Sequence, residues 1–237
     1  MQLTIQRIDF DLAVEFSEMS AFRGAVARLL SDQLKKSGSP ELADLAHQHE
    51  KDSSVIYRYP LIQYKHLYGR AAIIGIGEGA NAVECLRNLG HEAVRLHGRH
   101  AQLTTLQQKR NTLGLRLLPE PQTYTINKWI ALNADNYAQY QVADGLIGRA
   151  MILESLLKHH VVEFAKGVGW HIPQKFRLHI QEMESYPIGF KGNTFLAFTV
   201  KFATDAFLPN YIGLGKGKSH GYGMIKQVSS KKGHRRP

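Results

Sequence analysis

The sequence predicts an α+β protein made of two tandem ferredoxin-like (RRM-like) halves. Segments with apolar side chains at every second position alternate with segments whose apolar side chains recur at helical spacing. In the first half the order is strand, helix, strand, strand, helix, strand, which is the ferredoxin-like order. A similar order can be traced again in the second half, so the chain is predicted to repeat one architecture.

The first half begins with a predicted strand at residues 2–9, where apolar and polar side chains alternate. Residues 20–36 have apolar side chains at helical spacing and predict an amphipathic helix, which ends near Ser37-Gly38-Ser39-Pro40. A polar stretch follows at residues 40–54 and could be a loop.

The middle of the first half predicts an antiparallel hairpin. Two strand-like runs, at residues 59–65 and 71–76, are separated by a short turn around Tyr68-Gly69-Arg70. A helix is expected at residues 79–89, closed by Gly90. Residues 92–96 are then expected to form the last strand of this half.

The second half repeats these signals less regularly. A strand is predicted at 123–130, a helix at 133–165 with a break near Gly145, and further strands at 175–180, 194–202 and 224–228. We therefore expect an N-terminal domain at residues 1–105, a C-terminal domain at residues 120–228 and a disordered basic tail at residues 229–237.

Charge gives the first indication of function. The chain has 237 residues and a formal net charge of +10. A basic excess favours polyanionic partners, because neutralising phosphates releases condensed counterions. The single cysteine, Cys85, excludes an intramolecular disulfide. No signal-peptide pattern and no apolar run of the ~18 residues that span a bilayer is present, so we expect a cytoplasmic protein with no membrane contact.

A glycine-rich segment at residues 213–223 is the most distinctive part of the sequence. Glycine lacks a Cβ, so the backbone can turn tightly and its N–H groups can converge on a phosphate. The spacing does not fit a P-loop, and the alternative interpretation is a flexible loop. The residues predicted to bind the phosphates of a nucleic acid are Gly213, Gly215, Lys216, Gly217, Lys218, Ser219, His220, Gly221 and Gly223.

The same segment carries a resemblance to a known family. It fits Gly-hydrophobic-Gly, five residues with Lys or Arg, then Gly-hydrophobic-Gly, with Leu214 and Tyr222 in the hydrophobic places. This resembles the C-terminal signature of the CRISPR repeat-cleaving endoribonucleases, the "Cas six" family. The stretch from Tyr57 to Lys65 is similar to one branch of that family. The resemblance implies two ferredoxin-like halves and an enzyme that cuts CRISPR repeat RNA in precursor transcripts to give guide RNAs.

The resemblance also implies catalytic residues. Members of the family often place a catalytic histidine after the first helix, and the similar branch has a His-x-His pair, which His47 and His49 match. Both imidazoles could converge if their segment is a loop, because residues two apart in an extended chain face the same way. The alternative is two solvated surface histidines.

RNA chemistry suggests how such an enzyme works. The 2′-OH can attack its own phosphodiester, which leaves a 2′,3′-cyclic phosphate, and histidines suit the roles of base and acid. Lysine or loop N–H groups can stabilise the developing charge, so we expect neither a metal nor a cofactor. Tyr57, Lys65 and His220 are further candidates, the first two as possible support.

Two other kinds of site fit the sequence less well. Gly75-Ile-Gly-Glu-Gly-Ala80 fits a dinucleotide-binding fingerprint, but the expected hairpin and the missing acidic residue after the next strand argue against it. Histidines at 91, 97, 100 and 159–160 lack a recognised metal-binding framework.

Two rival functions therefore stay open: a non-cleaving RNA-binding subunit of a CRISPR ribonucleoprotein and, more weakly, a nucleotide-binding oxidoreductase. Besides RNA, possible partners are other CRISPR effector subunits and a second copy of the chain.

Overall fold

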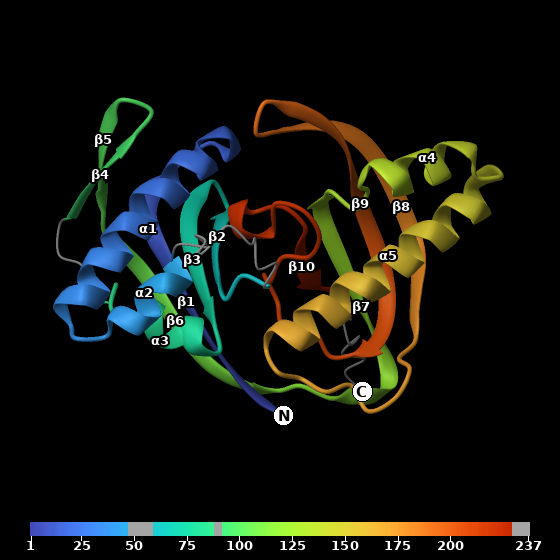
Figure 1. The fold of residues 1–237 in the computed structure, drawn as a ribbon, viewed down its shortest axis with the longest axis horizontal. Coiled ribbons are helices and arrows are strands. Elements are labelled where there is room, and N and C mark those ends of the chain that lie inside the picture. Colours follow the sequence, from blue (N-terminus) through green and yellow to red (C-terminus); the bar gives the residue numbers. More distant parts are fainter. Residues whose placement is uncertain (47–58, 88–91, 229–237) are drawn as a thin grey trace, which may run out of the picture.

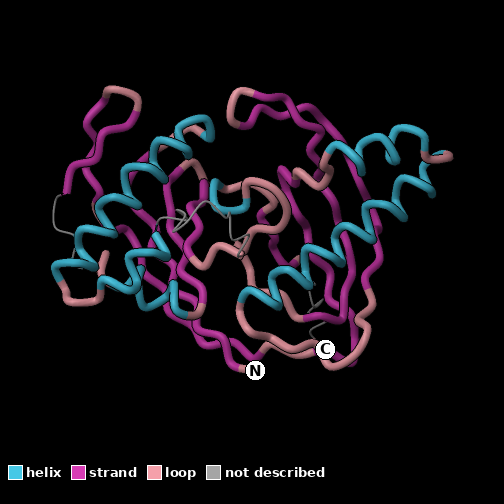
Figure 2. The backbone as a smooth tube through the Cα atoms, in the orientation of Figure 1, coloured by secondary structure: helices cyan, strands magenta, loops and turns pink. Residues whose placement is uncertain are grey.

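The structure, a computed structural model, describes residues 1–46, 59–87 and 92–228. Its two halves lie side by side, each with a four-stranded sheet, and a separate two-stranded hairpin projects from the first half (Figure 1). Figure 2 shows that helices lie on one side of each sheet and that loops lie between the two halves. The predicted α+β class with two sheet-containing halves is confirmed.

The first sheet has the strand order β2-β3-β1-β6, and all neighbours are antiparallel. The antiparallel hairpin predicted at residues 59–65 and 71–76 is confirmed, and its two strands are β2 and β3. Helix α1 buries Phe22, Val26 and Leu30 against the sheet because these side chains recur every three to four residues. The elements are β1 (Gln2–Ala13), α1 (Met19–Lys36), α2 (Pro40–Ala46), β2 (Ile62–Leu67), β3 (Arg70–Ile76), α3 (Glu78–Glu84) and β6 (Thr105–Gly114).

The second sheet has the strand order β10-β7-β9-β8. Read from the β8 edge, this is the order of the first sheet: second, third, first and fourth strand of the half. The predicted helix break is confirmed, since one helix ends at Val142 and the next begins at Gly145. The glycine segment, with a short 3-10 turn η2 (Lys218–His220), lies between the third and fourth strands of its sheet, the position that helix α3 has in the first half. The elements are β7 (Leu117–Trp129), α4 (Ala134–Val142), α5 (Gly145–Gly167), β8 (Leu178–Phe190), β9 (Asn193–Ala206) and β10 (Met224–Gln227).

The last strand of the first half is not where the sequence placed it. Residues 92–96 form β4 (Glu92–Leu96), which pairs with β5 (Arg99–Leu103) in a sheet of their own. Val94 and Leu96 are apolar because they pack with the α1 core. The true fourth strand, β6, has mostly exposed polar side chains and is held at the sheet edge by pairing with β1, so it carries little apolar pattern.

The polar stretch after the first helix is also more ordered than predicted. Its first seven residues form helix α2, which contacts α1 and α3. Residues 47–58, which contain the rest of the stretch, lie outside the described residues. The basic tail from Ser229 lies outside them as well.

The structure agrees with the argument against a dinucleotide-binding turn at residues 75–80. Strand β3 is antiparallel to both of its neighbours, whereas a dinucleotide-binding unit needs parallel strands. The glycines instead allow close packing, because a Cβ on Gly75 would lie 2.1 Å from the carbonyl oxygen of Gly79.

No helix in the described part of the chain is long and apolar enough to cross a bilayer.

One apolar core joins the two halves. Leu3, Ile5 and Ile76 of the first half share a cluster of buried side chains with Ile212 and Ile225 of the second. Since these side chains are at most 8% exposed, the halves are packed together rather than linked by a free tether. This packing fixes where the glycine segment lies.

Candidate functional site at the glycine loop

The glycine loop, residues 213–223, bridges the two halves. Toward the first half, the Gly213 N–H donates to Oε1 of Gln63 at 2.8 Å, and the Tyr59 hydroxyl donates to the Gly213 carbonyl at 2.9 Å. Toward the second half, the Lys216 N–H donates to the Ile130 carbonyl at 3.0 Å. The loop therefore lies at the junction between the halves, as Figure 1 shows for the segment before β10.

Several loop glycines have a structural reason to be glycine. Gly215, Gly217, Gly221 and Gly223 have φ of +78°, +73°, +91° and +59°, a region that other residues rarely adopt. A Cβ on Gly215 would lie 2.7 Å from Nε1 of Trp129, and one on Gly223 would lie 1.9 Å from the Leu214 carbonyl oxygen. The glycines thus let the loop pack tightly against the second half.

This packing uses part of the loop's N–H groups. The Leu214 N–H donates to the Gly223 carbonyl at 2.8 Å, and the His220 N–H donates to the Gly217 carbonyl at 2.7 Å. These two bonds lie within the loop, and those of Gly213 and Lys216 tie it to the two halves. The four bonds together fix the shape of the loop. Lys216 is the exposed cation on it, whereas Lys218 is half-buried. Contact of the loop with RNA stays a prediction.

Lys65 lies beneath the loop and is fully buried. Its Nζ donates to the Lys218 carbonyl at 3.2 Å, so this β2 side chain supports the loop from the first half. Burial lowers the pKa of Lys65 to about 7, because the charged ammonium loses its hydration. The residue predicted as possible support thus contacts the loop backbone in the structure.

Lys218 connects the loop to helix α5. Its ammonium forms an ion pair with the carboxylate of Glu163 and lies 5.5 Å from the centre of the Tyr59 ring. Burial raises the pKa of the Tyr59 hydroxyl, so this group is a neutral hydrogen-bond donor. Sequence reasoning missed Tyr59, Gln63 and Glu163 as partners of the loop. The first two fall within the Tyr57–Lys65 stretch that carried the resemblance, but Glu163 had no signal of its own.

His160 also belongs to α5, the helix that Lys218 of the loop contacts. Trp129 Nε1–H donates to its Nδ1 at 3.3 Å, so the proton of the neutral ring is on Nε2. Burial, followed by the charges of Lys218 and His159, lowers the pKa of His160 to about 3. His160 is therefore a neutral imidazole near pH 7, and its neighbour His159 is exposed.

His220 faces a hollow on the other side of the loop. The hollow has a volume of about 340 Å³ and lies between the start of α1 and the β8–β9 turn, where Phe16, Lys191 and Tyr222 also line it. Nδ1 of His220 lies 3.0 Å from the Ser219 hydroxyl. Burial, then the charges of Arg23 and Lys191, lowers the pKa of His220 to about 4, so this ring is neutral too.

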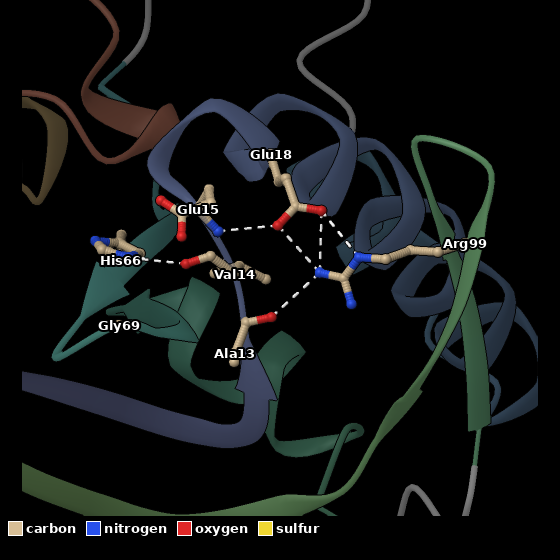
Figure 3. A pocket seen from close by; sticks show the side chains of 7 residues that line it. All are labelled: Ala13, Val14, Glu15, Glu18, His66, Gly69 and Arg99. Carbon is tan, nitrogen blue, oxygen red and sulfur yellow. Dashed lines mark hydrogen bonds and ion pairs between the residues drawn. The ribbon is translucent and has the colours of Figure 1, made fainter.

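A second hollow, of about 510 Å³, lies beside the β2–β3 turn (Figure 3). Two carboxylates line it, and one of them, Glu18, binds the guanidinium of Arg99 at 3.0 Å. The backbone N–H of Glu15, then Arg99, holds the pKa of Glu18 below its usual value. Arg99 lines the hollow as well, so the guanidinium in this lining is already paired with a carboxylate.

The predicted catalytic pair cannot be placed, because His47, His49 and Tyr57 lie outside the described residues. The described chain stops at the end of α2 and resumes at Tyr59, which bonds to the glycine loop. The convergence of the His47 and His49 imidazoles therefore stays a prediction.

The histidines weighed as a metal site are dispersed or undescribed. His97 and His100 are on the β4–β5 hairpin, His159 and His160 are on α5, and residue 91 lies outside the described chain. Among residues 1–46, 59–87 and 92–228, no three His, Cys, Asp or Glu side chains are grouped to hold a metal ion.

Comparison with known families gives matches in both halves. The model of the Cas6b N-terminal domain matches residues 1–113, and the model of the Cas6b C-terminal domain matches residues 117–228. An uncharacterized protein of Methanocaldococcus jannaschii is 32% identical over 103 residues, which are 44% of this chain and 69% of that protein.

Solved structures agree over nearly the whole chain. A crystal structure of Cas6b superposes with a TM-score of 0.84 at 25% identity, covering 96% of this chain and 100% of the other. A CRISPR RNA processing endoribonuclease Cas6b gives a TM-score of 0.71 at 22% identity, with the same coverage of 96% and 100%. Csf5, a type IV Cas6 crRNA endonuclease, gives 0.54 at 14% identity over 97% and 100%, and shows a shared fold.

Proposed function

Because this chain belongs to the Cas6b family, we propose that it is an endoribonuclease that cuts CRISPR repeat RNA in precursor transcripts to release guide RNAs. The observation that carries this proposal is the pair of Cas6b family models that together match residues 1–113 and 117–228. The glycine loop supports it, since the loop has the family's glycine spacing and lies where the two halves meet.

The reaction is attack of the RNA 2′-OH on the adjacent phosphorus. The bond from phosphorus to the 5′-oxygen breaks, which leaves a 2′,3′-cyclic phosphate on one product and a 5′-OH on the other. One group must remove the 2′-OH proton and another must protonate the leaving oxygen. His47 and His49 fill these roles, because imidazole exchanges protons near neutral pH. Neither a metal nor a cofactor takes part in the proposed step.

The glycine loop positions the RNA in this proposal. Lys216 is exposed on the loop, with its Nζ 4.3 Å from the centre of the Phe195 ring, and offers a charge to a phosphate. Lys65 and Tyr59 act indirectly, because they donate hydrogen bonds to carbonyl groups of the loop and so hold its backbone in place. Recognition works through the backbone and shape of the RNA, because a paired A-form stem hides its base edges in a narrow groove. A net charge of +10 favours this contact.

Assembly and location complete the proposal. CRISPR effector subunits or a second copy of the chain are further partners, and the cytoplasm is the expected location. The rival function is a non-cleaving RNA-binding subunit with the same fold, since a fold does not guarantee chemistry.

The test uses the full chain and a labelled CRISPR repeat RNA from the source genome, with EDTA present. A single cut with a cyclic phosphate end is expected from the wild type. His47→Ala and His49→Ala should each slow cutting by about 10²–10⁴-fold, the usual contribution of one acid or base, while RNA affinity is retained.

His100→Ala is the matched control, because His100 is an exposed histidine on the β4–β5 hairpin. This variant should cut at the wild-type rate. Tight binding by the wild type without any cut would overturn the nuclease proposal and favour the RNA-binding subunit. Cutting that stops in EDTA would overturn the metal-independent step.

A further inference from the structure

The turn between β2 and β3 holds an aromatic side chain in an unusual position. Tyr68 is 78% exposed, and its φ is +53°, followed by Gly69 with φ of +76°. Two successive positive φ angles are typical of a type I′ hairpin turn, in which Asn-Gly is the favoured pair. A tyrosine at this place adopts a backbone conformation that disfavours it, so the geometry of the turn does not account for the side chain.

The turn is anchored, so it presents Tyr68 from a fixed position. The Val14 N–H donates to the Gly69 carbonyl at 3.1 Å, and His66 Nε2 lies 3.0 Å from the Val14 carbonyl oxygen. Figure 3 shows Gly69, His66 and Val14 together at the end of β1. Arg70 adds an ion pair with Asp11.

The neighbours of Tyr68 are cations and a second tyrosine. Lys226 Nζ donates to the Tyr68 hydroxyl at 3.4 Å and lies 5.7 Å from the ring centre. The guanidinium of Arg7, which also pairs with Asp9, lies 4.8 Å from the ring centre of Tyr211. A hydrogen bond with Tyr211, then Lys226, lowers the pKa of Tyr68.

This group joins the two halves. Arg7 and Tyr68 belong to the first half, whereas Tyr211 and Lys226 belong to the second. Tyr211 also has a positive φ, of +72°. Two tyrosines in strained conformations thus meet two cations where the halves face each other.

We propose that Tyr68, with the exposed Lys226 beside it, binds an unpaired nucleotide of the substrate RNA, with the base stacked on the Tyr68 ring and an adjoining phosphate on Lys226. Aromatic rings beside cations are the usual means of holding single-stranded RNA, because every base has a stacking face and every linkage a charge. This subsite rests on the proposed function, since it adds a positioning contact for the same RNA.

The experiment compares Tyr68→Asn, Tyr68→Phe and wild type. Asparagine suits the turn and lacks the ring, so Tyr68→Asn should keep or raise the thermal midpoint while it removes stacking. Loss of one stacked base should raise the Kd for a CRISPR repeat RNA of the source genome by about 5- to 150-fold. Tyr68→Phe keeps the ring and should stay within a few-fold of wild type. Tyr137→Asn, at an exposed tyrosine of α4, is the control and should not change the Kd.

A second readout locates the nucleotide. The same repeat with 2-aminopurine at each unpaired position in turn should show, at one position, a fluorescence change on binding that Tyr68→Asn abolishes. Wild-type affinity of Tyr68→Asn, with wild-type fluorescence at every position, would overturn the subsite.

The cutting assay separates the two proposals. If the wild type cuts the repeat and Tyr68→Asn binds it equally well, only the subsite fails. If the wild type neither binds nor cuts the repeat, the proposed function fails and the subsite falls with it.

Discussion

The Nζ of Lys65, in the first half, donates a hydrogen bond of 3.2 Å to the carbonyl oxygen of Lys218, in the glycine loop of the second half. Lys65 is fully buried, so no solvent competes for this bond. A Cβ on Gly213 would lie 2.9 Å from the same Nζ, which shows how closely the loop covers the lysine. This contact makes the position of the loop sensitive to the state of one buried amine.

The stability of the protein should therefore depend on pH through Lys65. Its pKa is about 7 in the folded protein, and it is about 10.4 in an unfolded chain. Between these pH values the unfolded state binds more protons than the folded state does. The contribution of Lys65 to the free energy of unfolding therefore rises with pH from about 7 to about 10. Below pH 7 that contribution does not change with pH, because Lys65 is protonated in both states. Lys65→Met, which cannot titrate, should show a shallower rise.

Urea unfolding at several pH values between 6 and 10 measures this slope. Lys109→Met is the control, because Lys109 is exposed on β6. Parallel pH profiles for wild type and Lys65→Met would contradict the assignment.

A matched pair of glycine variants should separate backbone strain from steric fit. Gly215 and Gly192 share φ of +78°, but only Gly215 has atoms within reach of a Cβ, with Trp129 Nε1 at 2.7 Å. Gly192→Ala should cost about 1–2 kcal/mol of stability from the left-handed backbone. Gly215→Ala should cost about 1–3 kcal/mol more from overpacking. Equal losses in chemical denaturation would show that the contact with Trp129 is not tight.

Lys216 should contribute to RNA affinity through its charge. It is the exposed lysine of the loop, and one phosphate contact changes the slope of log Kobs against log salt by about one. Lys216→Ala should therefore lower the magnitude of that slope by about one across all RNA sequences. Binding titrations between 50 and 300 mM salt test this, with Lys175→Ala at another exposed lysine as the control. An unchanged slope would remove Lys216 from the RNA contact.

The proposed histidine pair predicts a bell-shaped dependence of cutting on pH. A base must be neutral and an acid must be protonated, so the single-turnover rate should fall on both sides of neutrality. His160 and His220, with pKa values of about 3 and about 4, should be neutral throughout this range and should not shape the curve. A rate that rises steadily with pH would instead indicate catalysis by hydroxide alone.

Elements whose signal is local could be predicted well. The β2–β3 hairpin and the helix break before Gly145 follow from short runs of sequence, and the structure has both. Strand β6 could not be found, because its polar side chains face solvent while its backbone pairs with β1, more than a hundred residues away at Gln2↔Gly114. Residues 92–96 were assigned to the sheet because burial against α1 gives the same apolar alternation as burial within it.

The sequence alone determined the α+β class, the repeated half, the basic charge and the glycine loop, because composition and short-range spacing record these properties. Only the tertiary structure decided what the loop touches. Lys65 meets Lys218 across 153 positions and Tyr68 meets Lys226 across 158, and neither pair has a signal in its own segment. Such contacts exist because a shared core packs the two halves together, and no periodicity along the chain reports which surfaces that packing brings face to face.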